Sequence, residues 1–547
     1  MLPNLLFPEI KETIEDITKK YPKRPEWLVV TRIAPSPTWF VHIWNVYSAM
    51  LDDIFAHKDK WVAFLRIEDT DQKREVEWAR FKINEIFKTF WLVFDEGPIW
   101  PDNTDIWDYW PYTQSKREYL YKVFAKYLLE KWFAYPCFMT EEEINEVRQN
   151  QTIWKQVPWI YGWYSIWRNA KEEDVIKALE EKKEFVVRFK SPWKIGDRVV
   201  VSDLVKWDVE TNDNFLDIVL IKKWGLPTYH FAHLVDDYLM WTTHVFRSDE
   251  WYASQPLHEQ LFKVFGFVAP KYVHYAPLIK LDNWNKRKLS KRKDMEADVE
   301  YYFKLGYPVI AIIDYLANII NAWYEDWRKE NKEKSFKEFD FKIEKMSQAW
   351  ALVDMEKLDF VSKEYIATLW IEELYDLFIS WASKYDNELL KIVNKYPDYT
   401  KEALNIEREL ENPPKRFQKM SDIPAQLTFF FDEIYDNLDI NLAELIPTLN
   451  KEAISNFLKN YITWFNLDQS KDEWFAELKN IALKSGFALN NKEFIEWTHV
   501  WKIWDAAMIL RVVLCGQRNT PDLYETMQVM WKERVEKRLK NPSIFSK

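Results

Sequence analysis

The stretch R-I-A-P-S-P-T-W-F-V-H-I-W-N, residues 32–45, runs from a strand through a proline-containing loop into a helix. The run that leads into it, residues 27–33, is short, apolar and β-branched, which is typical of a buried strand. Proline ends such a strand because it fixes φ and lacks a backbone donor. Helical spacing follows over residues 41–56, and residues 62–67 again favour a strand. This order predicts the opening of an α/β nucleotide-binding domain.

The pattern changes twice farther along the chain. Residues 118–220 favour helix first and then short β-branched runs, which predicts an insertion with a fold of its own. Strand candidates return within residues 227–246 and 272–281. The remainder is almost wholly helical, with a long amphipathic stretch at 342–379. We therefore expect a Rossmann-like α/β catalytic domain that carries an insertion, followed by all-α C-terminal domains.

The length of 547 residues, at 66.6 kDa, exceeds what one hydrophobic core usually serves. We expect an N-terminal extension at 1–26, the first half of the catalytic domain at 27–117, the insertion at 118–220, the second half of the catalytic domain at 221–294, a helical domain at 295–380 and an all-α domain at 381–547.

Apolar residues make up 48% and charged residues 30% of the chain, as in a folded globular protein, and no window is apolar enough to span a bilayer. The first 26 residues lack the features of a secretory signal, so we expect a cytoplasmic protein with no membrane partner. A monomer is the default expectation. The net charge of -11 argues against indiscriminate nucleic-acid binding but leaves a structured RNA partner open. Cys137 and Cys515 are too few for a disulfide framework or a four-ligand Cys/His zinc site, so we expect no structural metal.

Glycine and tryptophan occur in abnormal amounts. Glycine contributes 8 of 547 residues, although roughly 7% is usual, and tryptophan contributes 31. Together they reach about the ordinary glycine content. One interpretation is a Trp-rich lineage with unusual cores. The other is that most Trp positions are glycines of the native protein, as when UGA codons that the organism reads as Gly are translated as Trp. Trp61, Trp132, Trp154 and Trp284 lie in polar turn contexts where Gly is expected.

Two short segments carry candidate chemistry. His42 lies at the expected start of a helix, where phosphate is attracted and an imidazole can donate to it. By itself, a histidine at a helix start is more often structural. The second segment, K-L-S-K-R-K at 288–293, concentrates cations that suit a polyphosphate. A solvated basic loop is the alternative, and the near-copy K-M-S-Q at Lys345 shows how easily such strings arise.

Together these two segments resemble the two ATP-binding motifs of class I aminoacyl-tRNA synthetases. That family usually has H-I-G-H in the first motif, whereas this chain has Trp44 and Asn45 at the last two places. Further segments resemble the glutamyl-tRNA synthetase branch in their proper order: R-I-E-D-T-D (66–71), D-E-G-P (95–98), P-Y-T-Q-S-K-R (111–117), L-P-T-Y-H-F (226–231), V-D-D-Y-L-M (235–240) and H-V-F-R-S-D-E-W (244–251). The similarity continues into the helical tail, so it spans nearly the whole chain.

The resemblance implies particular site residues. The glutamate pocket would consist of Arg32, Ala34, Ser36, Glu68, Tyr229, His233 and Arg247. ATP contacts would come from His42, Trp44, Asn45, Glu250, Trp251, Lys288 and Lys291, with His42, Lys288 and Lys291 as the catalytic residues. The chemistry is compatible, because arginine clamps carboxylates bidentately. No protein metal ligand is implied.

The resemblance also concerns the tryptophans. Trp251 stands where the family itself has Trp, so it is expected to be genuine. Other tryptophans align with family glycines: Trp39, Trp44, Trp91, Trp110, Trp132, Trp241, Trp284, Trp497 and Trp531.

The reaction implied is activation of glutamate by ATP, with Mg²⁺ on the ATP phosphates, followed by transfer to the 3' end of tRNA(Glu). Charging of tRNA(Gln) as well stays open. A glutaminyl-tRNA synthetase shares the catalytic fold, but its tail is expected to be a β-barrel. A shorter tRNA-modifying relative lacks the tail and the lysine loop. From another class, a catalytically inactive tRNA-binding regulator gains support if Trp44 is real.

Overall fold

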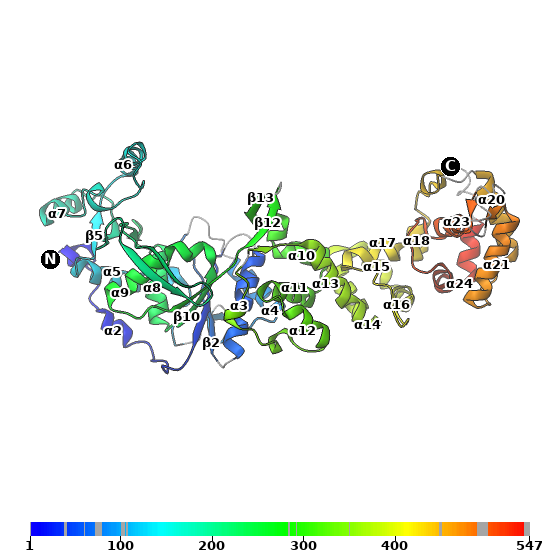
Figure 1. Cartoon of the computed structure of the whole chain (residues 1–547), viewed down its shortest axis with the longest axis horizontal. Coiled ribbons are helices and arrows are strands. Elements are labelled where there is room, and N and C mark those ends of the chain that lie inside the picture. The colour runs from blue at the N-terminus through cyan, green and yellow to red at the C-terminus, as the bar shows by residue number, and fades with distance from the viewer. Residues whose placement is uncertain are drawn as a thin grey trace. The chain divides into compact units, whose positions relative to one another are not determined.

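The chain is described by a computed structural model, which covers residues 2–37, 41–58, 61–71, 79–99, 104–105, 108–282, 285–290, 293–348, 350–447, 451–488 and 501–540. It forms two compact units. Unit 1 comprises Met1–Tyr301 and Ile313–Asp354, and unit 2 comprises Tyr302–Ile312 and Met355–Lys547. Figure 1 shows the elements of each unit by label.

The centre of unit 1 is a parallel arrangement of strands. Strand β1 (Val30–Ile33) pairs with β2 (Val62–Leu65), and helix α3 (Ile43–Lys58) joins them and packs on both (Figure 1). Strand β10 (His244–Ser248) lies on the other side of β1, where the Thr243 amide donates to the Val30 carbonyl at 3.0 Å. The strand, helix and strand expected at the start of the chain are therefore confirmed, as is the α/β fold class.

The parallel order continues beyond β10. Strand β11 (Lys271–Tyr275) pairs with β10 in parallel and meets β7 (Arg198–Asp203) at one residue pair, Tyr272 and Asp203. Strand β7 forms an antiparallel hairpin with β8 (Trp207–Asn212). Part of the sequence expected to be an insertion therefore contributes to the same sheet as the catalytic strands.

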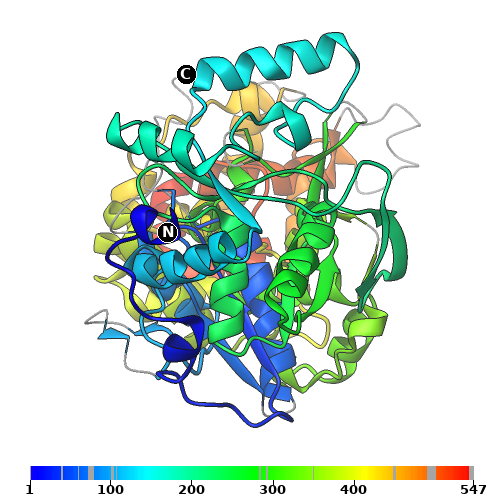
Figure 2. The ribbon, with the colours of Figure 1, turned by 90° about the vertical axis from the view of Figure 1, so that its left-hand side faces the viewer.

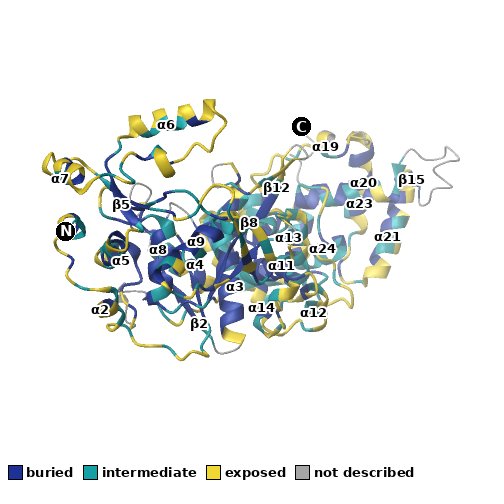
Figure 3. Cartoon of the chain, turned by 60° about the vertical axis from the view of Figure 1, so that its left-hand side comes forward, coloured by how far each residue is buried: buried dark blue, intermediate teal, exposed yellow. Residues whose placement is uncertain are grey.

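Other strands of the inserted sequence form a second, antiparallel sheet. It contains β5 (Ala134–Cys137), β6 (Val186–Phe189) and β9 (Val219–Ile221) in that order. Helix α6 (Glu141–Ile153) is exposed along most of its length, as its yellow colour in Figure 3 shows, and Figure 2 shows it in cyan apart from the central strands.

Two expectations of secondary structure were wrong in detail. Residues 227–246 were expected to supply strands, but most of them form helix α8 (Tyr229–Leu239). Its buried Phe231, Leu234 and Val235 recur at helical spacing, and the aromatic and β-branched composition concealed that spacing. The amphipathic stretch 342–379 is divided, because it contains the short η6 (Ile343–Lys345) and the strand β14 (Ala351–Leu352) before α13 (Met355–Thr368) and α14 (Ile371–Tyr385).

The remaining elements of unit 1 are these: α1 (Leu2–Leu6), α2 (Ile14–Thr18), α4 (Ala79–Thr89), β3 (Pro98–Ile99), β4 (Thr104–Asp105), η1 (Gln114–Arg117), α5 (Glu118–Glu130), η2 (Gly162–Tyr164), α7 (Glu172–Glu180), η3 (Asp249–Ser254), α9 (Gln255–Phe265), β12 (Leu278–Asp282), β13 (Asn285–Lys288), η4 (Met295–Ala297), α11 (Val309–Ile320), α12 (Tyr324–Glu330), η5 (Phe336–Glu338), η6 (Ile343–Lys345) and β14 (Ala351–Leu352). Helices α10 (Val299–Leu305) and α11 are each divided between the two units.

Unit 2 is mostly helical and is built around one apolar core that includes Phe378, Leu458, Leu510 and Val535. Besides α13 and α14 it contains α15 (Asn387–Val393), α16 (Pro397–Asn405), η7 (Met420–Asp422), α17 (Ile423–Leu427), η8 (Thr428–Phe430), α18 (Asp432–Tyr435), α19 (Leu442–Leu445), α20 (Lys451–Trp464), α21 (Lys471–Lys484), β15 (Phe487–Ala488), β16 (Trp501–Lys502), α23 (Ile503–Cys515) and α24 (Leu523–Leu539). Among the described helices of both units, none has the length and apolar character that crossing a membrane requires.

A buried charge network joins helix α8 to η1 and α5 in unit 1. Asp236 accepts hydrogen bonds from Arg117 Nε at 2.7 Å, from Gln114 Nε2 at 2.8 Å and from the Tyr121 hydroxyl at 2.8 Å. The side chains of Asp236 and Arg117 are fully buried. Removing one partner of such a pair leaves an uncompensated buried charge.

We expect Asp236→Ala to lower the free energy of unfolding of unit 1 by about 3–5 kcal/mol, because Arg117 loses its buried counter-ion. Asp326→Ala is the matched control, since Asp326 pairs with Lys329 on the surface and should leave unfolding nearly unchanged. Differential scanning calorimetry of both variants measures the difference. Equal transition temperatures for the two variants would contradict the stabilising role of Asp236.

Candidate active site

The largest gathering of the expected site residues is a cavity of about 810 Å³ in unit 1. It lies where β1 ends at Ile33, α3 begins at Ile43 and β10 ends at Ser248. In an α/β sheet the carboxyl ends of parallel strands are the usual place for a ligand, because loops and helix starts meet there. The position agrees with the order of elements expected from the sequence.

Most of the expected residues line this cavity. They are Arg32, Ala34, Ser36, His42, Trp44, Asn45, Glu68, Tyr229, Arg247, Glu250, Trp251 and Lys288. His233 does not line it, because its side chain is fully buried behind Arg32, with Nδ1 3.3 Å from Arg32 Nη2. Lys291, Trp39, Trp284 and Trp497 lie outside the described residues. Two segments about 245 residues apart in the sequence thus meet at one cavity.

His42 immediately precedes helix α3, and its proton position can be worked out from its contact. Its Nδ1 accepts a hydrogen bond from the backbone amide of Trp44 at 2.9 Å. Because that nitrogen is an acceptor, the proton of a neutral imidazole must be on Nε2. The His42 side chain is therefore arranged as a hydrogen-bond donor at the start of a helix.

Trp44, the second residue of α3, lines the same cavity. Its ring centroid lies 5.1 Å from that of Tyr275 and 5.5 Å from that of Tyr47. A glycine at this position would leave the backbone of α3 open to the cavity. The indole therefore takes up space at the place where the sequence predicted contact with ATP.

Arg32 lies on β1 and Arg66 directly follows β2, and both side chains pair with the carboxylate of Asp237. Arg66 Nη1 donates to Asp237 Oδ1 at 2.6 Å, and Arg32 Nε lies 3.5 Å from the same oxygen. Burial alone would raise the pKa of Asp237, but Arg66, His233 and Arg32 hold it well below its usual value. Asp237 therefore remains charged and fixes both guanidinium groups, of which that of Arg32 belongs to a residue that lines the cavity.

Glu68 faces the cavity beside these arginines. Arg66 Nη2 donates to Glu68 Oε1 at 3.3 Å. Burial raises the pKa of Glu68, and the charges of Arg66 and Arg32 oppose that rise only in part. A cationic group brought into the cavity next to Glu68 would stabilise its charged form.

Arg247 comes from β10, and its side chain is only 4% exposed. Its Nε donates to His274 Nε2 at 2.7 Å, and its Nη1 lies 2.8 Å from His258 Nδ1. Nη2 is buried and has no hydrogen-bond partner among the described residues. Arg247 itself lines the cavity, and Nη2 is its one guanidinium nitrogen that no described residue accepts from.

The far side of the cavity contains aromatic and charged residues that suit a nucleotide. The rings of Tyr229 and Trp251 lie 4.2 Å apart. Lys288, at the end of β13, forms an ion pair of 2.7 Å with Glu250, and both side chains are about half exposed. Such an exposed pair is weak, so an anionic ligand can replace the glutamate as the partner of Lys288.

Sequence reasoning did not name several lining residues, including Asp71, Lys222, Thr228 and Tyr275. Lys222 donates to the Thr70 carbonyl at 2.9 Å, and it lies in the K-K-W-G turn that precedes the L-P-T-Y-H-F segment. The closeness of Lys222 to that segment in the sequence was the one feature from which its place in the site could have been predicted. Asp237 and His258, which hold the arginines, could not be assigned because no local pattern connects them to the cavity.

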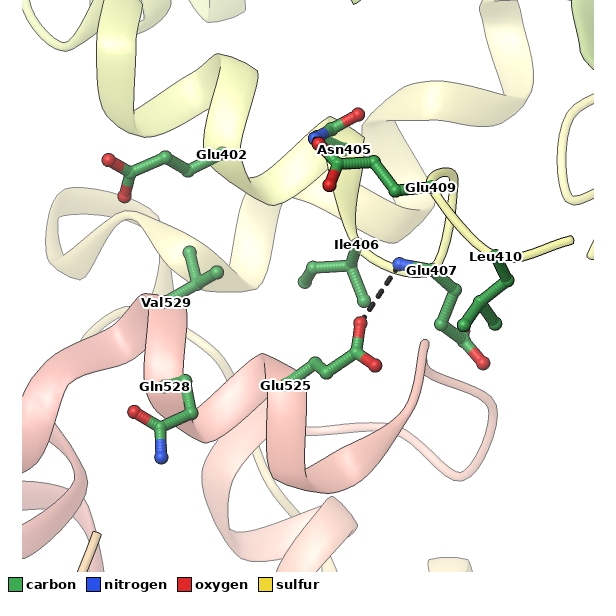
Figure 4. A pocket seen from close by; sticks show the side chains of 9 residues that line it. All are labelled: Glu402, Asn405, Ile406, Glu407, Glu409, Leu410, Glu525, Gln528 and Val529. Atoms are coloured by element: carbon green, nitrogen blue, oxygen red, sulfur yellow. Dashed lines mark hydrogen bonds between the residues drawn. The ribbon is translucent and has the colours of Figure 1, made fainter. Parts of the chain in front are cut away.

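A second cavity lies in unit 2 between α16 and α24 and has a volume of about 520 Å³ (Figure 4). Figure 4 shows that its lining is acidic, with Glu402, Glu407, Glu409 and Glu525 around it. Glu525 Oε2 accepts from the backbone amide of Glu407 at 2.9 Å. Negative charge is unfavourable for phosphate, so this cavity does not compete with unit 1 as an ATP site.

The described residues contain no group of three or more His, Cys, Asp or Glu side chains that could hold a metal ion. Cys137 and Cys515 are both free and buried. The sulfur of Cys137 lies 4.0 Å from the Ser165 hydroxyl.

Two family models match the chain. The first, described as tRNA synthetases class I (E and Q), catalytic domain, matches residues 28–360, and the second, an anticodon binding domain, matches residues 373–542. A glutamate–tRNA ligase of Clostridium perfringens (strain SM101 / Type A) is 43% identical over 546 residues, with 98% of each chain covered. One from Clostridium beijerinckii is 42% identical over 542 residues, again with 98% of each covered.

Solved structures agree with these relatives. The glutamate–tRNA synthetase of Elizabethkingia anophelis has a TM-score of 0.70 at 27% identity and covers 94% of this chain and 99% of its own. A glutamate–tRNA ligase of Elizabethkingia meningosepticum, solved with its amino acid, has a TM-score of 0.67 at 26% identity and covers 93% and 98%. Since sequence relatives, both family models and these folds span nearly the whole chain, the chain belongs to the glutamate–tRNA ligases, within the class I tRNA synthetases for E and Q.

Proposed function

We propose that this chain activates glutamate with ATP to form glutamyl-adenylate and then transfers the glutamyl group to the 3' end of tRNA(Glu). The observation that carries the proposal is the pairing of Arg32 and Arg247 on one cavity with His42 and Lys288. Two guanidinium groups suit a substrate with two carboxylates, and the other two residues suit phosphates. Full-length relatives named glutamate–tRNA ligases support the same reaction.

In this proposal Arg32 and Arg247 bind the two carboxylates of glutamate, and Glu68 binds its α-ammonium. Ala34, Ser36 and Tyr229 complete the amino-acid pocket. The unpartnered Nη2 of Arg247 and the ionised state of Arg32 support the carboxylate roles. His233 contributes through Arg32, because it is buried behind that side chain and does not line the cavity.

For the nucleotide, His42 donates from Nε2 to the α-phosphate as the glutamate carboxylate attacks. Asn45, Glu250 and Trp251 contact ATP, while Lys288 and Lys291 neutralise the departing pyrophosphate. Mg²⁺ would come as part of the MgATP substrate and would offset the phosphate charge, and we expect no structural zinc. We expect transfer to tRNA to depend on positioning and charge stabilisation, which are sufficient without a protein base.

The division of the chain at residues 26, 117, 220, 294 and 380 belongs to the same proposal, with 118–220 as the part that binds the tRNA acceptor end and 381–547 as the part that binds the anticodon. The match of residues 373–542 to an anticodon binding domain supports the last assignment. We propose a cytoplasmic monomer, because translation consumes tRNA and ATP there, and leave charging of tRNA(Gln) open.

We further propose that most tryptophans of the printed sequence are glycines in the native protein. Among the residues that the structure describes, eight non-glycine residues have a positive φ, and five of them are tryptophans: Trp91, Trp132, Trp207, Trp241 and Trp531. A bulky residue with positive φ is a rare outlier, whereas glycine adopts it freely. Trp531 has φ 62° and ψ 154°, a combination reached essentially by glycine alone.

Exposure supports the same proposal. Tryptophan is normally a well-buried residue on average. Of the 25 tryptophans whose exposure is described, only Trp474 is buried, and 15 are exposed. Trp132 is 76% and Trp163 is 83% exposed. Side chains with so little packing have no structural reason to be tryptophan.

If Trp44 is present in the native protein, a different function is favoured. The indole would then stand where ATP is expected, and the chain would fit a catalytically inactive tRNA-binding regulator. A glutaminyl-tRNA synthetase is less favoured, since unit 2 is mostly helical and its relatives are glutamate ligases.

The native protein should catalyse ATP–pyrophosphate exchange with glutamate only when tRNA is present, as in the family it resembles. The measurement is exchange of radiolabelled pyrophosphate with glutamate or glutamine, with and without tRNA. Exchange with glutamine but not with glutamate would refute the assignment. Loss of all ATP binding would favour the regulator.

Lys288→Ala should lower kcat for adenylate formation about 10²–10³-fold, because a charge that stabilises the departing pyrophosphate is lost. The KM for glutamate should change little, since Lys288 lies on the phosphate side of the cavity. Lys286→Ala is the control, because Lys286 is an exposed lysine of the same strand, β13, that does not line the cavity. An equal loss in both variants would point to a general effect of loop charge.

Trp44→Gly, made in a protein expressed from the printed sequence, should increase ATP affinity at least tenfold by vacating the space beside His42. Trp501→Gly, outside this cavity, serves as the control. In native material, tandem mass spectrometry of the peptide with residue 44 should find glycine. Tryptophan at that position would overturn the glycine proposal.

A further inference from the structure

Four of the eight histidines in the chain surround Arg247: His230, His233, His258 and His274. His258 and His274 contact its guanidinium directly, and both side chains are buried, at 0% and 1% exposure. The proposed function assigns no role to either of them. The geometry of their hydrogen bonds nevertheless fixes what they can do.

Arginine only donates hydrogen bonds, so every nitrogen that faces it must accept. His274 Nε2 accepts from Arg247 Nε at 2.7 Å, which places the His274 proton on Nδ1. That Nδ1 lies 2.7 Å from Asp203 Oδ2, which accepts it. His274 is therefore a neutral ring held between Arg247 and the carboxylate of Asp203.

The same reasoning applies on the other edge of the guanidinium. His258 Nδ1 faces Arg247 Nη1 at 2.8 Å and must accept, so the His258 proton is on Nε2. That nitrogen lies 2.9 Å from His230 Nδ1, which is the acceptor. Both rings next to Arg247 are consequently neutral acceptors in defined tautomers.

The protonation behaviour of the rings is compatible with this arrangement. Burial lowers the pKa of His274 to about 4, although Asp203 opposes the change. Burial and the charge of Arg247 lower the pKa of His258 well below its usual value. Both rings thus remain neutral at physiological pH.

Neutrality has a consequence for the charge of Arg247. Arg66 and Arg32 share the carboxylate of Asp237, whereas no ion pair between Arg247 and a carboxylate occurs among the residues that the structure describes. A carboxylate acceptor would neutralise the guanidinium and compete with a substrate carboxylate, but an imidazole accepts a hydrogen bond without doing so. The ring of Tyr272, 4.3 Å from the guanidinium carbon, closes the remaining face.

We infer that His258 and His274 are positioning residues for glutamate binding, which as neutral acceptors fix two edges of Arg247 and leave its charged Nη2 for a substrate carboxylate. This inference rests on the proposed function, in which Arg247 binds glutamate. Neither histidine touches substrate. Both act through Arg247, and His230 and Asp203 orient them in turn.

The test compares the KM for glutamate, the KM for ATP and kcat in tRNA-dependent pyrophosphate exchange by the full-length native protein. His258→Leu and His274→Leu should each raise the KM for glutamate about tenfold or more, since a hydrogen bond to a charged group is lost. The KM for ATP should stay within about twofold. His244→Leu is the control. His244 is a buried histidine that lies on β10, as Arg247 does, and does not line the cavity, so this variant should change neither KM value.

Conservative variants separate positioning from packing. In His258→Asn the side-chain oxygen takes the place of Nδ1, and in His274→Gln it takes the place of Nε2, so both should restore most of the glutamate affinity. His258→Asp matches Asn in shape but adds a charge beside Arg247, and it should raise the KM for glutamate as His258→Leu does. If the leucine variants do not fold, the Asn and Asp pair decides the matter.

The variants separate a failure of this inference from a failure of the proposed function. If Arg247→Gln raises the KM for glutamate but Asn, Asp and Leu at position 258 all behave like wild type, the inference is overturned while the proposed function stands. If Arg247→Gln leaves the KM for glutamate unchanged, the assignment of Arg247 in the proposed site is itself wrong. A parallel rise in the KM for ATP would reveal a general disturbance of the cavity and would also overturn the inference.

Discussion

The ion pairs that Asp237 makes with Arg66 and Arg32 are the constraint on which the cavity of unit 1 depends. Arg66 directly follows β2, Arg32 lies on β1 and Asp237 lies on α8, and all three are buried, so the ion pairs join the two strands and the helix at one point. The arrangement is costly in desolvation, since buried ion pairs rarely stabilise a fold more than apolar packing does. Its benefit is positional, because it holds Arg32 and Arg66 in one orientation beside Glu68.

The two sides of the cavity use different means to hold their cations. On one side a carboxylate shared by two arginines leaves surplus positive charge. On the other side neutral imidazoles hold Arg247 and preserve its whole charge. The phosphate side is looser, with Lys288 in a half-exposed ion pair. A rigid amino-acid pocket next to an adjustable phosphate region is consistent with an enzyme that binds glutamate by charge and releases pyrophosphate.

The sequence allowed the strand, loop and helix at residues 27–56 to be predicted, because proline, β-branched residues and helical spacing are local signals. It failed at α8, where aromatic and β-branched residues concealed the helical spacing of the buried positions. The lining residues that belong to motifs could be named in advance. The supporting residues His258, His274 and Asp203 could not, because hydrogen bonds between segments far apart in the sequence define their roles.

The most direct test of this account is a crystal structure of the native protein with a non-hydrolysable glutamyl-adenylate analogue. We expect the side-chain carboxylate of the analogue and its acyl group between Arg32 and Arg247, the ammonium at Glu68 and the phosphate-mimicking group at His42 Nε2. We also expect glycine density at position 44. An analogue bound elsewhere, or its carboxylate bound away from both arginines, would contradict the account.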